Sequence, residues 1–181
     1  MGGGGTGDTL LFKDETTDMF FAIKKYVPKD KRYIDEHYER FVDEIKIFFN
    51  ISHPNIVRIY NYYLYPYSKT GFLQMEYVEG ICIDQYEPML WDDKGWEEIF
   101  SDTIDAFRYL EKNHILHRDI RPANILIDKN GNVKIIDFGF GKQLNKTRDN
   151  SNSVLLNWPA TEMPNEVQLN QEYDERTEIY F

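Results

Sequence analysis

Residues 114–139 read HILHRDIRPANILIDKNGNVKIIDFG and carry the strongest structural signal in the chain. Within this stretch, the turn-forming residues Lys-Asn-Gly-Asn at 129–132 separate two short apolar runs, ILI and VKII. Asn-Gly between apolar runs favours a β-hairpin, because both residues accept the positive φ angles that a tight turn requires. We therefore expect a hairpin here, with Asn124 and Asp137 close together at its open end.

Two carboxylates and one carboxamide stand beside this hairpin. Asp119 and Asp137 each come at the end of a short apolar run, and Asn124 follows the first of them by five residues. A carboxylate beside a carboxamide offers the oxygen ligands that Mg²⁺ prefers. The other carboxylate, Asp119, would be available to accept a proton from a hydroxyl group. The alternative interpretation is a polar turn that brackets a buried hairpin.

The same residues resemble the signature of the protein kinase family. The HRD of residues 117–119, followed by Asn124, is similar to the catalytic-loop motif H-R-D-L-x-x-x-N, and residues 137–139 are the D-F-G motif. The resemblance implies that Asp119 is the catalytic base and that Asn124 and Asp137 hold metal ions.

One catalytic position departs from the family pattern. Arg121 stands where the family usually has a lysine, two residues after the catalytic Asp. Arginine keeps the positive charge but not the compact ammonium group. Tyrosine kinases of the Src type carry arginine at this position, whereas Pro122 is more similar to the Ser/Thr branch, so the two residues point to different acceptors.

The N-terminal MGGGGTG has the glycine spacing of a phosphate-binding loop. Gly2, Gly4 and Gly7 fit G-x-G-x-x-G, in which the missing Cβ atoms let the backbone approach phosphates. The resemblance places Thr9 where the family usually has a nucleotide-contacting valine. A flexible linker and an N-myristoylation signal, M-G-x-x-x-[S/T] ending at Thr6, are the two alternative interpretations of this segment.

An apolar run ends at Lys24, and its last four residues, FAIK, resemble the V-A-I-K of kinase strand β3. The resemblance assigns Lys24 to the ATP phosphates and makes Glu44 its ion-pair partner. Apolar residues at helical spacing predict a helix around Glu44. The residues of this expected apolar stripe are Tyr38, Phe41, Ile45, Phe48 and Phe49.

The resemblance also implies an adenine pocket. Met75 would lie at its back, and the backbone of Glu76 and Val78 would pair with the adenine edge. Ala22 and Leu126 would enclose the ring from either side. The cofactors implied are therefore ATP and Mg²⁺.

Aromatic and β-branched residues predict strands over 56–67 and 70–78, with a break at 66–71. A helix is expected over 91–113, because apolar residues there recur at helical spacing. The residues of this second stripe are Trp96, Ile99, Phe100, Ile104, Phe107 and Leu110.

Together with the resemblance, these elements imply an α+β, two-lobed, protein-kinase-like fold. We expect a small lobe with an antiparallel sheet over residues 1–79 and an incomplete helical large lobe over residues 80–181. The chain ends where the family's helix αF begins, so another chain or a missing segment would complete the large lobe.

The polar run after Gly139 corresponds by resemblance to an activation segment. Its candidate phosphorylation sites are Thr147, Ser151 and Ser153. The segment ends with Ala-Thr-Glu at 160–162, where the family has A-P-E.

The charge balance and the cysteine count indicate which partners and which cellular compartment to expect. The chain has 31 acidic against 21 basic residues, a net charge of −10, so nucleic acid and anionic membranes would repel its surface. A single cysteine, Cys82, excludes an internal disulfide and fits a reducing compartment. We expect a cytoplasmic protein that acts on a protein substrate.

The sequence thus predicts Mg²⁺-dependent transfer of the ATP γ-phosphoryl group to protein hydroxyls, with Ser and Thr as the favoured acceptors. Two alternatives remain open. One is a catalytically inert, truncated kinase or pseudokinase that serves as a nucleotide-binding or interaction module. The other is a small-molecule kinase of the aminoglycoside or choline type, which shares the Asp…Asn pair and the metal-binding Asp but not typically the arginine before the catalytic Asp.

Overall fold

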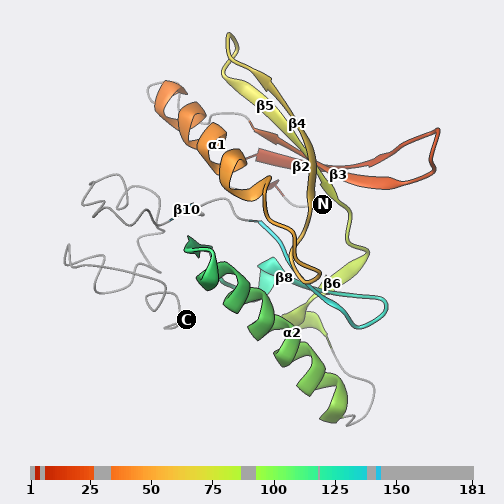
Figure 1. The fold of residues 1–181 in the computed structure, drawn as a ribbon. Helices are drawn as coiled ribbons and strands as arrows, with labels where there is room; N and C mark the ends of the chain where they lie inside the picture. The colour runs from red at the N-terminus through yellow and green to blue at the C-terminus, as the bar shows by residue number, and fades with distance from the viewer. Residues whose placement is uncertain are drawn as a thin grey trace.

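The chain forms an antiparallel sheet with one helix beside it, followed by a second helix and a smaller sheet (Figure 1). This structure is a computed structural model. It describes residues 3–4, 7–26, 34–86, 93–117, 119–137 and 142–143.

The first sheet has five strands in the order β1-β2-β3-β5-β4. Their bounds are β1 Gly3–Gly4, β2 Gly7–Lys13, β3 Phe20–Tyr26, β4 Ile59–Tyr65 and β5 Thr70–Glu76. All four strand pairs are antiparallel, as expected for this part of the chain. The β2–β3 turn is held by the Asp14 carboxylate, which accepts hydrogen bonds from the backbone N–H groups of Thr16 and Thr17.

Helix α1, Ile34–Phe48, packs its apolar stripe against this sheet. Four of the five stripe residues are buried, and the Tyr26 and Phe41 rings stack with their centroids 4.4 Å apart. The prediction was wrong for Phe49, which follows the end of the helix and is 42% exposed. Its ring lies edge-on to Tyr62 at the border of the sheet, because the chain turns away from the helix axis there.

The break predicted at 66–71 is shorter in the structure, because β5 already begins at Thr70. Gly71 pairs with Tyr26 on one side and Leu64 on the other. A Cβ at Gly71 would lie 2.6 Å from the Phe41 ring. Glycine is thus required here by the close approach of α1, not by a turn.

The second half contains helix α2, Asp93–Lys112, and a three-stranded sheet in the order β6-β8-β9. Its strands are β6 Gly80–Cys82, β8 Ile125–Asp128 and β9 Val133–Ile135, and short 3-10 turns cover Ile83–Gln85 and Pro122–Asn124. A two-residue pair, β7 Ile115–Leu116 with β10 Lys142–Gln143, completes the secondary structure. The predicted hairpin is confirmed as β8–β9, with Gly131 at φ +86°.

Helix α2 buries only part of the predicted stripe. Ile99 and Leu110 are 1% exposed, whereas Phe100 and Ile104 are 59% and 47% exposed, so the prediction was wrong for these two. The buried side of the helix passes through Ala106 instead, which is fully buried. No helix in the described parts of the chain is long and apolar enough to span a bilayer.

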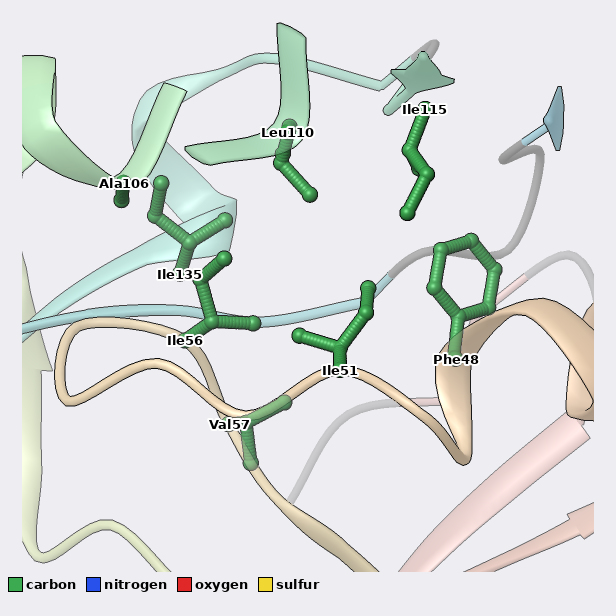
Figure 2. Close-up of a cluster of buried hydrophobic side chains, with 8 residues drawn as sticks. All are labelled: Phe48, Ile51, Ile56, Val57, Ala106, Leu110, Ile115 and Ile135. Carbon is green, nitrogen blue, oxygen red and sulfur yellow. The ribbon is translucent and has the colours of Figure 1, made fainter. Parts of the chain in front are cut away.

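An apolar cluster connects the two halves of the molecule (Figure 2). Phe48 comes from the end of α1, Ile56 from the segment before β4, Leu110 from α2 and Ile135 from β9. Ile51, Val57, Ala106 and Ile115 complete the cluster. The boundary expected between residues 79 and 80 stays a prediction, although the larger sheet ends at Glu76 and the smaller one begins at Gly80.

Candidate active site

Lys24 joins the larger sheet to the end of the β8–β9 hairpin. It lies on β3 between Thr9 of β2 and Leu73 of β5, and its Nζ is 2.5 Å from Asp137 Oδ1. The Lys24 side chain is 12% exposed. Burial lowers the pKa of Lys24, but the charges of Asp137 and Glu44 oppose it and leave the pKa raised, so the ammonium stays charged.

Glu44 on α1 lies within electrostatic range of both Lys24 and Asp137. Burial raises the pKa of Glu44 to about 7, Lys24 opposes this rise, and the negative charge of Asp137 adds to it. Among the described residues, the carboxylate in direct contact with Lys24 is that of Asp137, and Glu44 acts on the ammonium through space. The direct Lys24–Glu44 pair therefore stays a prediction.

Asn124 fixes the position of Asp119. Its Nδ2 donates to Asp119 Oδ2 at 2.7 Å and to the Asp119 carbonyl at 2.8 Å. Asn124 is 6% exposed, and its own backbone N–H donates to the Arg121 carbonyl at 2.9 Å. The carboxylate is thus held by a buried amide, and its charge also reaches Lys24.

His117 ties the Asp119 loop to the end of β9, a role that the sequence analysis did not assign. Its Nδ1 accepts the Asp119 backbone N–H at 3.2 Å, so its Nε2 donates to the Ile136 carbonyl, also at 3.2 Å. Full burial lowers the pKa of His117 to about 4, against the smaller effects of the Ile136 carbonyl and of Asp119 and Asp137. The signal was present in the sequence, since His117 is the first residue of the H-R-D motif.

Asn124 and Asp137 are brought together as the hairpin predicted, because the Ile136 backbone N–H donates to the Asn124 carbonyl at 2.8 Å. Asp137 has φ +58°, a conformation that is uncommon outside glycine. Backbone strain of this kind persists where the surroundings enforce it, which is frequent at functional sites.

The residues present fit a magnesium ion. Both hydrogens of the Asn124 amide are used on Asp119, and its oxygen takes no hydrogen bond from the described residues. That oxygen and the Asp137 carboxylate are hard ligands, and Mg²⁺ usually binds one or two carboxylates together with phosphate oxygens. Within the described ranges, no three His, Cys, Asp or Glu side chains form a complete metal site.

The nucleotide-binding residues predicted from the sequence lie on β3, β5 and β8 and in the connection after β5. Ala22 pairs with Met75 across β3 and β5, and Leu126 lies on β8 opposite Cys82 of β6. Glu76 ends β5, and Val78 follows it in the connection to β6. All five side chains are partly buried.

Gly4 of β1 pairs with Gly7 of β2, and half-buried Thr9 pairs with Lys24. Arg121 is exposed beside the Asp119 loop. Gly2, Arg118, Phe138, Gly139 and the three candidate phosphorylation sites lie outside the described residues, as do residues 160–162.

Comparison with known proteins identifies a family. The model of the protein kinase domain matches residues 1–180. Serine/threonine-protein kinase PrkC of Bacillus subtilis is 36% identical over 160 residues, which cover 86% of this chain and 24% of PrkC. Serine/threonine-protein kinase pakA of Dictyostelium discoideum is 30% identical over 169 residues, covering 90% of this chain and 14% of pakA. The chain therefore spans a quarter or less of the length of these relatives.

Proposed function

Because the chain belongs to the protein kinase family, we propose that it transfers the γ-phosphoryl group of ATP to hydroxyl groups of proteins. The observation that carries this proposal is the convergence of Lys24, Asp119, Asn124 and Asp137 from separate segments of the chain. Serine and threonine are the proposed acceptors, since the relatives above are named serine/threonine-protein kinases.

Bound Mg²⁺-ATP would supply the phosphoryl group and the cation that neutralises charge as the phosphoryl moves. Asp137 and Asn124 would hold the metal through their side-chain oxygens. Lys24 would present its ammonium to the phosphates, and Glu44 would balance that charge once Asp137 turns to the metal. These tasks are positioning and charge stabilisation, which provide most of the catalysis in phosphoryl transfer.

Asp119 would orient the acceptor hydroxyl and take its proton. The two hydrogen bonds from Asn124 restrict the rotation of this carboxylate, and the His117 ring anchors the backbone next to it. A fixed base reduces the entropy that must be lost before reaction. Arg121, exposed beside the loop, would add positive charge near the transferred group.

Neighbouring lysines on β3 provide a matched test. Lys24→Met should lower the rate of phosphoryl transfer to Ser- and Thr-containing peptides by roughly a hundredfold or more, as expected when a group that stabilises transition-state charge is removed. Lys25→Met is the control, because Lys25 is exposed on the other face of the strand with its Nζ 6.0 Å from the Phe72 ring centroid.

Equal activity in the two variants would refute the role of Lys24. No transfer by the wild type, with ATP binding retained, would favour the nucleotide-binding module over the enzyme. Peptides with Ser, Thr or Tyr as the sole acceptor would decide the acceptor class.

A further inference from the structure

A second ion pair connects the larger sheet to the β8–β9 hairpin. Lys134 Nζ lies 2.7 Å from Glu76 Oε1, and the two side chains are 17% and 24% exposed. Lys134 is the middle residue of β9, three residues before Asp137. Glu76 is the last residue of β5, where the chain leaves the larger sheet.

The Glu76 carboxylate also contacts the backbone of Arg58, just before β4. Its Oε2 accepts the Arg58 backbone N–H at 3.2 Å, and the Glu76 backbone N–H donates to the Arg58 carbonyl at 2.8 Å. The end of β5 is therefore fixed to the segment that precedes β4 by both backbone and side chain.

That segment is in turn fixed to β9. The Val57 N–H donates to the Ile135 carbonyl at 2.9 Å, and the Ile135 N–H donates to the Asn55 carbonyl at 2.8 Å. The side chains of Val57 and Ile135 belong to the cluster that joins the two halves (Figure 2). These bonds and the Glu76–Lys134 pair form a closed ring of contacts that runs from β5 through residues 57–58 to β9 and back.

We propose that Glu76 and Lys134 are positioning residues that hold the adenine-binding edge at a fixed place relative to β9, the strand that leads to Asp137. This inference rests on the proposed function, since it assigns a task to side chains around the same nucleotide site. The pair is the only link in the ring that joins Glu76 directly to β9, and it depends on two replaceable charges. Within this ring, the remaining connection between the end of β5 and β9 runs through residues 57–58.

An exposed pair in nearly the same place supplies a matched control. Lys129 Nζ lies 3.0 Å from Glu79 Oε2 and also joins the segment after β5 to the hairpin, but both side chains are about 70% exposed. Exposed pairs contribute little, because water screens their charges, whereas removing one partner of a largely buried pair leaves the other charge unpaired.

The test compares Glu76→Gln, Lys134→Met, the double variant and Lys134→Arg with the wild type and with Lys129→Met. Calorimetric titration with Mg²⁺-ADP gives the dissociation constant without requiring catalysis. Thermal unfolding measures the stability of each variant, and amide hydrogen exchange at Val57, Arg58 and Ile135 reports the ring itself.

We expect each single substitution to weaken Mg²⁺-ADP binding at least about threefold, with a non-additive double variant, as for residues in direct contact. Exchange at the three amides should accelerate, Lys134→Arg should keep near-wild-type affinity, and Lys129→Met should change neither measurement. A fall in thermal stability with unchanged affinity and unchanged exchange would overturn the inference, since the pair would then be only structural. If the wild type bound no nucleotide, the proposed function would fail, and the exchange rates alone would support or overturn the link to β9.

Discussion

Glu44→Gln removes a carboxyl group whose charged form is disfavoured by burial. The Glu44 carboxylate faces the interior on α1, and burial together with the nearby Asp137 raises its pKa to about 7 although Lys24 attracts it. Between pH 4.5 and about 7 the folded protein keeps a proton on Glu44 that the unfolded chain releases. The contribution of Glu44 to stability therefore falls as the pH rises through this interval.

The size of this change in stability follows from the shift in the pKa of Glu44. A change from the ordinary value of 4.5 to about 7 corresponds to about 3 kcal/mol, at about 1.4 kcal/mol for each pKa unit. Glutamine has nearly the same shape and carries no charge. The free energy of unfolding of Glu44→Gln should thus improve relative to the wild type by about 3 kcal/mol between pH 4 and pH 8.

Urea unfolding at pH 4.5, 6 and 7.5, without nucleotide or metal, measures this difference. The control is Glu39→Gln on the exposed side of the same helix, where the carboxylate stays in water. A wild type that gains stability over Glu44→Gln as the pH rises would refute the reasoning, because Glu44 would then be favourably paired in the free protein. A constant difference would also refute it.

Three further predictions follow from burial and packing. His117 is neutral when folded, because burial lowers its pKa to about 4. Its contribution to stability should therefore be lost as the pH falls from 6.5 towards 4. NMR titration of the imidazole would contradict this if the ring became protonated near pH 6.5. Gly80→Ala should destabilise the fold by roughly 1–3 kcal/mol, because its Cβ would lie 2.4 Å from the Ile127 carbonyl oxygen. Gly95→Ala on α2 meets nothing within 4 Å and should stabilise the fold by up to about 1 kcal/mol. Equal effects of the two substitutions in thermal unfolding would contradict the close packing at Gly80. Leu110→Ala should lower the free energy of unfolding by about 2–5 kcal/mol, whereas the exposed Ile104→Ala should lower it by less than about 1 kcal/mol. Similar losses for the two variants in chemical denaturation would contradict the assigned core.

The hairpin at residues 125–135 was predictable because its signals are local. Asn-Gly requires a tight turn, and the alternation of apolar residues fixes which side chains face inward. The position of Asn124 beside Asp137 follows from the same register. The helix around Glu44 was equally accessible, since its stripe has a clear helical period.

Other features depend on contacts between distant segments and could not be derived from spacing. Phe100 and Ile104 fit a helical stripe as well as Ala106 does, and only the position of the smaller sheet decides which side of α2 is buried. Likewise, the motifs suggest Glu44 as the partner of Lys24, whereas the direct contact is with Asp137, 113 residues away. The Glu76–Lys134 pair gives no local sequence signal at all, because it joins a residue of β5 in one sheet to a residue of β9 in the other.

Intact mass after incubation with Mg²⁺ and ATP tests the central proposal most directly, with Asp119→Asn as the comparison. Both proteins should bind ATP, since Asp119 is assigned to the hydroxyl rather than to the nucleotide. Phosphoryl groups should be added to the wild type alone, with Thr147, Ser151 and Ser153 as the first sites to examine. Equal phosphate on both proteins, or none on a wild type that binds Mg²⁺-ATP, would contradict the assignment of Asp119 as the catalytic base of an active kinase.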